Sequence, residues 1–224
     1  NYLMANIQFP QVAALAQIVE RLRHMFDLSA DTTTIAMHLA TDPDLAMRVE
    51  ALPGLRVPGA WDSFELAVRA ILGQQISVTA ATTLASRLVA AYGEPLIAGE
   101  ISWAAPELRF VFPCPERLIG ADLTKLGITK ARSHAITTLA AQLAKNPDLL
   151  QGVRELEITV KQLCKLPGIG EWTAHYIAMR SLREPDAFPT GDLALLRSMT
   201  ARDPLMTKAK LAKRAEDWRP WRAY

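Results

Sequence analysis

The stretch Leu163-Cys164-Lys165-Leu166-Pro167-Gly168-Ile169-Gly170-Glu171-Trp172-Thr173-Ala174 decides the fold. Apolar residues at helical spacing precede it, and a second amphipathic run follows it. Proline lacks the backbone N–H and disfavours helix in the residue before it, whereas glycine accepts positive φ and leaves room for a close neighbour. The pattern therefore predicts a helix, a tight hairpin at Pro-Gly-Ile-Gly and a second helix.

The hairpin admits two interpretations. It presents backbone N–H groups at a helix N-terminus, where the partial positive charge suits a phosphate. An ordinary Gly-Pro turn between two packed helices explains the same spacing. The residues alone leave both open.

Length and composition set broad limits. The chain has 224 residues, enough for one large domain or two small ones, and a net charge of only +2, which is compatible with a nucleic-acid partner but does not require one. Residues 207–224 are locally basic. This segment is either a solvated helix face or a surface that faces phosphates. Cys114 and Cys164 are too few for a disulfide framework or a four-thiolate iron–sulfur site. Without a long apolar run or a signal-peptide pattern, we expect a soluble intracellular protein.

The elements with a clear period are helical, so the sequence predicts an all-α class. A strand is expected over residues 1–8, and residues 93–115, which include Trp103, read as a loop with little regular structure. We expect helices over 10–28, 62–75, 78–92, 115–121, 130–144 and 193–200, with Asp31, Asp42, Ser77, Thr129 and Thr207 as N-caps. The first and last residues look like parts of a longer polypeptide.

Gln74 and Gln75 stand between two buried helices, and Ser77 caps the second. Buried amides need partners, so this is either a polar inter-helix turn or a loop that enters DNA. Lys130 and Arg132 lie in the first turn of a helix, where cations oppose the dipole. A phosphate contact or a surface coincidence explains them.

Three residues are candidates for chemistry. Asp192 follows Pro189-Thr190-Gly191 and opens a helix, so it is either a plain N-cap or a functional carboxylate. Trp172 and Tyr176 lie one turn apart on one helix face, which core packing alone also explains. The four histidines show no metal-ligand pattern and are expected to be structural or on the surface.

Four ordered motifs resemble the helix-hairpin-helix (HhH-GPD) DNA glycosylases, in particular the 3-methyladenine DNA glycosylase II branch. They are Leu166-Pro-Gly-Ile-Gly-Glu-Trp-Thr-Ala174, Asp186-Ala-Phe-Pro-Thr-Gly-Asp192-Leu193, Val68-Arg-Ala-Ile-Leu-Gly-Gln-Gln-Ile-Ser-Val78 and Trp218-Arg-Pro-Trp-Arg-Ala-Tyr224. The resemblance implies two helical bundles flanking a DNA-binding cleft. Residues 1–8 would be the remnant strand of an upstream β-rich domain, and residues 9–224 the glycosylase domain, with halves 9–62 plus 184–224 and 63–183.

The resemblance also implies residue roles. Asp192 would be catalytic, and Trp172 and Tyr176 would line the base pocket. Bifunctional relatives carry a lysine where this chain has Trp172, so a strand-cleaving lyase activity is not expected. DNA contacts are expected from Gln74, Gln75, Ser77, Lys130, Arg132, Gly168, Gly170 and Thr173. Gln75 matches the residue that, in the resembled family, fills the gap left by an extruded base. A bacterial enzyme of that branch has leucine at this position, so Gln75 is a departure from the family pattern.

The resemblance implies no required cofactor, but it does imply a structural monovalent cation, Na⁺ or K⁺, held by the backbone carbonyls of Cys164, Leu166 and Ile169. The expected activity is hydrolytic excision of flipped alkylated purines, of the 3-methyladenine and 7-methylguanine type, from double-stranded DNA. The alternatives are a non-enzymatic DNA-binding module, a helical partner-binding domain, and a glycosylase for another base such as hypoxanthine or an oxidised base. A monomer without membrane association, cytoplasmic in a bacterial-type cell and associated with the nucleoid, is expected.

Overall fold

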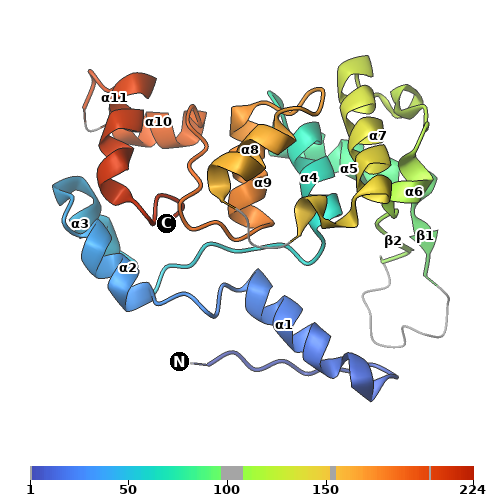
Figure 1. Ribbon diagram of the computed structural model, residues 1–224, viewed down its shortest axis with the longest axis horizontal. Coiled ribbons are helices and arrows are strands. Elements are labelled where there is room, and N and C mark those ends of the chain that lie inside the picture. Colours follow the sequence, from blue (N-terminus) through green and yellow to red (C-terminus); the bar gives the residue numbers. More distant parts are fainter. Residues whose placement is uncertain (1, 97–107, 152–154, 202) are drawn as a thin grey trace. The chain divides into compact units, whose positions relative to one another are not determined.

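The computed structural model describes residues 2–96, 108–151, 155–201 and 203–224 (Figure 1). Of the loop predicted over residues 93–115, the middle part, residues 97–107 with Trp103, lies outside the described residues. Contacts divide the chain into two compact units, Asn1–Trp61 and Asp62–Tyr224. All the candidate site residues belong to the second unit. The predicted grouping of residues 9–62 with 184–224 therefore stays a prediction.

The first unit is a short helical segment. It contains η1 (Val12–Ala14), α1 (Leu15–Met25), α2 (Thr32–Leu39) and α3 (Pro43–Ala51). Asp31 and Asp42 cap α2 and α3 as predicted. Asp27 is buried, and its carboxylate accepts the N–H of Val57 at 3.1 Å, which ties the end of the unit back to its first helix.

The predicted strand over residues 1–8 is wrong: residues 2–9 have no regular secondary structure. A strand requires a neighbouring strand for its backbone ladder. Within the described residues, strand pairing occurs only between β1 and β2, further along the chain.

The second unit holds the remaining elements, and helices dominate it. They are α4 (Ser63–Leu72), α5 (Val78–Tyr92), β1 (Glu94–Pro95), β2 (Phe110–Val111), α6 (Pro115–Leu118), η2 (Leu123–Leu126), α7 (Lys130–Lys145), η3 (Pro147–Leu150), α8 (Leu156–Leu163), α9 (Glu171–Arg180), α10 (Leu193–Thr200), α11 (Lys208–Arg214) and η4 (Ala215–Trp218). The all-α prediction is confirmed. The short antiparallel pair β1–β2 was not predicted, because two-residue strands leave no period to detect.

Side-chain caps fix where the helices begin. Asp62, Ser77, Thr129, Asp192 and Thr207 each accept a backbone N–H from the first turn of α4, α5, α7, α10 and α11. A cap satisfies donors that have no partner within the helix. The predicted caps in this unit are therefore confirmed.

The core of the second unit lies between α4, α5, α7, α8 and α9. Ile71, Leu88, Ile136, Leu163 and Ile177, one from each of these helices, are fully buried in it. Helix α9 contacts both α4 and α8, so the second helix of the hairpin is held on two sides (Figure 1). The hairpin is thus anchored to the core of the unit.

The hairpin itself closes through Gly168. Its φ is +75°, a left-handed conformation that side chains rarely adopt, and an added Cβ would lie 2.7 Å from the Cβ of Ala135 on α7. Gly170, two residues on, is the N-cap of α9 with extended backbone, and an added Cβ would meet nothing within 4 Å. The first glycine therefore serves packing, and the second leaves the start of α9 open.

Among the described residues, no helix combines the length and the apolar character needed to cross a membrane.

The two hairpin glycines should differ sharply in their tolerance of alanine. Gly168→Ala combines a strained φ with a clash against α7, so we expect it to lower the free energy of unfolding by about 2–4 kcal/mol. Gly170→Ala, the matched control, should lower it by less than about 1 kcal/mol, because only N-cap preference is lost. Urea unfolding of both variants measures this, and equal losses would contradict the assignment of Gly168 to packing.

Candidate functional site

Asp192 lies where a loop, residues 185–192, meets α10. Gly191 before it has a φ of +100°, which turns the chain into the helix. The Asp192 Oδ1 accepts the backbone N–H groups of Ala194 at 2.9 Å and Leu195 at 3.0 Å. One carboxylate oxygen is thus occupied by the helix cap, as the structural interpretation of the sequence requires.

The other oxygen of Asp192 has a different partner. The indole Nε1 of Trp172, on α9, donates a hydrogen bond to Oδ2 at 3.1 Å. A carboxylate has about four acceptor positions, so three donors leave one for a further group. The half-buried side chain of Asp192 is therefore fixed between two helices and still has a position for a water or a developing positive charge.

Trp172 also stacks on Tyr176. The ring centroids are 5.2 Å apart and the planes are inclined by 14°. Two rings at this spacing leave no room for a third between them, so a base can meet only an outer face or an edge of the pair. The structure thus confirms that these aromatic residues share one face of α9 and brings them to Asp192.

Arg180, one turn further along α9, extends this cluster. Its guanidinium carbon lies 5.6 Å from the Tyr176 ring centroid, and its Nη1 donates to the Tyr176 hydroxyl at 3.3 Å. A cation over an aromatic ring is attracted by about 0.5–2 kcal/mol. Arg180 was not among the residues predicted for the site, although its spacing of four residues from Tyr176 was a usable signal.

A second cluster joins the glutamine turn to the hairpin. The Nε2 amide of Gln74 donates to the carbonyl of Gly168 at 2.9 Å and to the Thr173 hydroxyl at 3.0 Å. The two hydrogens of this amide are used within the protein, and the Thr173 side chain is buried. The predicted DNA contact of Thr173 thus remains open only for its backbone N–H at the start of α9.

Gln75 forms the tip of the same turn. It is exposed and has a φ of +55°, which is uncommon for a residue other than glycine. The guanidinium of Arg132 donates to the carbonyl of Gln74 and so fixes the turn from α7. The backbone strain at Gln75 is thus held in place by neighbours on two sides.

The remaining predicted DNA contacts are less constrained. The hydroxyl of Ser77 accepts the N–H of Ala80 at 3.2 Å as the cap of α5, and Lys130 is exposed on the first turn of α7. Their contacts with DNA stay predictions.

The carbonyls predicted to hold a monovalent cation lie at the end of α8 and in the hairpin. Cys164 is the C-cap of α8, and the carbonyl of Leu166 accepts the N–H of the buried Ile169 at 3.2 Å. Carbonyl oxygens are hard donors that suit such ions. Burial, followed by the charge of Glu171, raises the pKa of the Cys164 thiol, so the neutral thiol is favoured. The residue types fit the ion, which stays a prediction.

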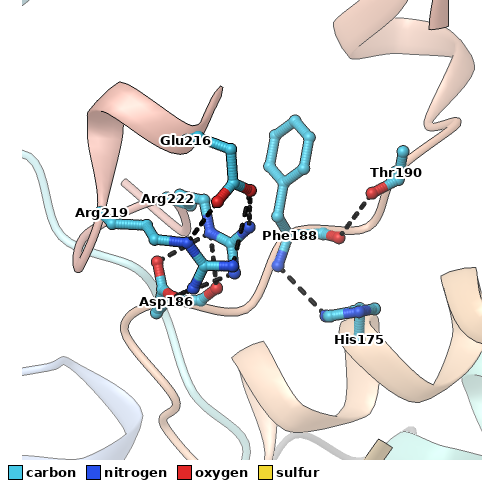
Figure 2. A network of polar contacts seen from close by, with 7 residues as sticks. All are labelled: His175, Asp186, Phe188, Thr190, Glu216, Arg219 and Arg222. Carbon is cyan, nitrogen blue, oxygen red and sulfur yellow. Dashed lines mark hydrogen bonds and ion pairs between the residues drawn. The ribbon is translucent and has the colours of Figure 1, made fainter. Parts of the chain in front are cut away.

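The loop that carries Asp192 is supported from α9 by a histidine. The Nδ1 of His175 accepts the backbone N–H of Phe188 at 3.2 Å (Figure 2). Accepting this bond requires the neutral imidazole. Burial lowers the pKa of His175, and the nearby Arg222 lowers it further, against the opposing carboxylates of Glu171, Glu157 and Asp186. The expected structural role of His175 is confirmed, but its support of the Asp192 loop was missed.

Helix α9 contributes residues to both clusters of the candidate site. Trp172, Tyr176 and Arg180 occupy one cluster with Asp192, and Thr173 joins the other cluster with Gln74. An anion beside an aromatic pair can stabilise a cationic transition state or a cationic ring.

Two family models match the chain. The model of the AlkA N-terminal domain matches residues 1–62, and the model described as "HhH-GPD superfamily base excision DNA repair protein" matches residues 68–222. The boundary between them falls beside the boundary between the two compact units.

Curated relatives cover most of the chain. A protein of Mycobacterium tuberculosis described as "Probable bifunctional transcriptional activator/DNA repair enzyme AlkA" is 41% identical over 204 residues, which are 91% of this chain and 40% of the relative. "DNA-3-methyladenine glycosylase 2" of Escherichia coli is 35% identical over 93% of this chain and 69% of the relative. The chain thus spans less than half the length of the mycobacterial protein.

Solved structures share the fold. The 3-methyladenine DNA glycosylase from Archaeoglobus fulgidus has a TM-score of 0.78 at 22% identity, covering 96% of this chain and 73% of its own. The 8-oxoguanine glycosylase/lyase of Clostridium acetobutylicum in complex with double-stranded DNA has a TM-score of 0.75 at 17% identity, covering 93% and 71%.

The histidine support predicts a dependence of stability on pH. Because the pKa of His175 is lowered in the folded protein, the unfolded chain binds a proton first as the pH falls below about 6.5, and the free energy of unfolding then decreases. His175→Asn supplies an amide acceptor in place of Nδ1 but does not titrate. Its stability relative to the wild type should therefore rise between about pH 7 and pH 5.

Urea unfolding across this range measures the difference, and the other histidines cancel because both proteins contain them. His175→Ala, which removes the acceptor, should be destabilised at every pH by about 1–3 kcal/mol. A constant difference between the wild type and His175→Asn would contradict the role of the neutral imidazole.

Proposed function

Because the chain belongs to the HhH-GPD superfamily of base excision DNA repair proteins, we propose that it is a monofunctional DNA glycosylase. It hydrolyses the bond between deoxyribose and an alkylated purine of the 3-methyladenine or 7-methylguanine type. The observation that carries this proposal is the carboxylate of Asp192, held by the N-terminus of α10 and by the indole of Trp172.

The reaction needs one well-placed anion. Breaking a glycosidic bond builds positive charge on the sugar, and a carboxylate beside that charge stabilises the transition state. The remaining acceptor position of Asp192 suits this charge or the attacking water. The residue therefore has both the fixed orientation and the free capacity that the role requires.

Alkylated purines suit the site because they need little other help. A base methylated at N3 or N7 is cationic and leaves as a neutral molecule, so a general acid is not needed. The electron-rich pair Trp172 and Tyr176 attracts such a cation, by about 0.5–2 kcal/mol at the ring face that the base meets. Relatives named as 3-methyladenine glycosylases support this substrate class.

The absence of lyase chemistry rests on Trp172. Lyase activity requires an amine that attacks the sugar and forms a Schiff base. An indole cannot do this, and here it is already committed to Asp192. The proposed product is therefore an abasic site in an intact strand.

Double-stranded DNA is the proposed partner. The start of α9 offers backbone N–H groups beside the open space at Gly170, which fits a phosphate. The tip at Gln75 is exposed, and in this proposal it fills the gap left by a flipped nucleotide. Action as a monomer, a monovalent cation at the hairpin and a location at the nucleoid belong to the same proposal.

Arg180 favours a second candidate substrate. Its guanidinium lies over Tyr176, so part of the attraction of that ring for a cation is already used, and its charge repels a cationic base. A neutral damaged base such as hypoxanthine would not meet this repulsion. Release of hypoxanthine and 7-methylguanine, compared at equal enzyme, separates the two substrates. A binding module without activity would release neither.

Asp192→Asn should abolish base release while DNA binding persists. The amide keeps an oxygen for the cap of α10 but removes the charge, so we expect the single-turnover release rate for 3-methyladenine to fall at least about 100-fold. Asp62→Asn is the matched control, because Asp62 caps α4 in the same way through the N–H of Glu65 at 2.6 Å. Unchanged release by Asp192→Asn would remove the residue from this role.

Two substitutions of Trp172 separate its two contacts. Trp172→Phe keeps the ring but loses the hydrogen bond to Asp192, so it should slow release of cationic and neutral bases by similar factors. Trp172→Ala also loses the ring, so its extra loss should be greater for the cationic base. Single-turnover assays on both substrates test this, and equal extra losses would indicate packing alone.

A further inference from the structure

The loop 185–192 begins in a network of ion pairs. The carboxylate of Asp186 accepts hydrogen bonds from Arg222, through Nε at 2.7 Å and Nη2 at 2.9 Å, and from Arg219 (Figure 2). The Arg222 side chain is only 8% exposed and that of Asp186 17%. This is a two-point pairing of a planar guanidinium with a carboxylate, which fixes direction as well as distance.

Arg222 is itself held in place. Its Nη1 donates to Glu216 at 2.9 Å, and its Nε also lies 3.1 Å from the carbonyl of Asp186. Beside it, the N–H of Ala223 donates to the carbonyl of Pro185 at 3.0 Å. The segment 216–223, which follows α11, therefore lies along the start of the loop.

Contacts continue from Asp186 toward Asp192 without interruption. Ala187 is fully buried with Leu156 of α8 and Ala178 of α9. Phe188 is buried, and its ring packs edge-on against that of Trp218, with the ring centroids 6.1 Å apart.

The second half of the loop is closed by backbone bonds. The N–H of Thr190 donates to the carbonyl of Phe188 at 2.7 Å, and the N–H of Asp192 donates to that of Pro189 at 3.0 Å. The loop between Asp186 and Asp192 therefore has little conformational freedom, so a displacement of Asp186 would be transmitted to Asp192.

We propose that Arg222 is a positioning residue for Asp192, acting through its two-point pairing with Asp186 at the other end of the loop. The proposal rests on the proposed function. Its physical basis is that catalysis by a fixed anion depends steeply on where the anion lies, and a misplacement of about 1 Å can cost about 100-fold in rate. Lysine, a single point charge, cannot reproduce the planar pairing.

A simpler alternative is that the network only fastens the segment 216–223 to the rest of the unit. In that case its loss lowers stability, and the molecules that remain folded react at the normal rate. A positioning role instead slows the reaction of folded molecules. The loss of a fastening role therefore lowers only the fraction of active protein, whereas the loss of a positioning role lowers the rate constant.

The test uses Arg222→Lys and Asp186→Asn in the full-length protein, with single-turnover release of 7-methylguanine at saturating enzyme. We expect the rate constant to fall about 10- to 100-fold in each, with DNA affinity within about twofold of the wild type. The double variant should lose less than the product of the two single losses, because both changes break the pairing of Arg222 with Asp186. Arg117→Met is the control; it removes an ion pair with Glu94 (3.3 Å) and hydrogen bonds to the carbonyls of Tyr92 and Gly93 in the same unit, and it should leave the rate unchanged.

A second readout does not depend on activity. The indole N–H of Trp172 donates to Asp192, so its NMR signal, assigned with Trp172→Phe, reports the place of that carboxylate. We expect the signal to shift in Arg222→Lys and Asp186→Asn but not in Arg117→Met.

Wild-type rate constants with an unshifted indole signal in both variants, even with lower thermal stability, would overturn the proposal and leave a fastening role. A wild-type protein that releases no base would overturn the proposed function. The indole signal then still decides whether Arg222 sets the place of Asp192.

Discussion

The sharing of one carboxylate between two helices is the constraint on which the site depends. Asp192 caps α10 with one oxygen and accepts the indole of Trp172, on α9, with the other. The two contacts together set the direction of the Asp192 side chain. Because α9 also contacts α4 and α8, the carboxylate is held at a fixed position relative to the core of its unit. The functional and the structural interpretation of Asp192 are therefore compatible, since the helix cap uses only one of the two carboxylate oxygens.

Much of this unit follows from local rules. Asp62, Ser77, Thr129 and Thr207 cap helices because short polar side chains satisfy free N–H groups, and that preference can be read from sequence. The hairpin followed from Pro167 and the glycines around it. The motif resemblance, rather than spacing, distinguished Asp192 from an ordinary cap.

The features that sequence did not predict depend on partners far along the chain. The pairing of Asp186 with Arg222 joins residues 36 positions apart, and nothing local marks it. His175 was expected to be structural or on the surface, and its acceptor role depends on where Phe188 lies. The strand expected over residues 1–8 failed for the same reason, because its alternating pattern has no partner strand among the described residues.

The amide of Gln74 has a consequence for how DNA would be met. It links the glutamine turn to both the hairpin and α9, so the spacing between the exposed tip at Gln75 and the open N-terminus of α9 is preorganised. In a glycosylase, the tip at Gln75 would meet the gap left in the base stack by the flipped nucleotide, and the N-terminus of α9 would meet the phosphate backbone of the same duplex. The conformational entropy of fixing the spacing between these two points is then lost during folding, so less entropy is lost when the complex with DNA forms.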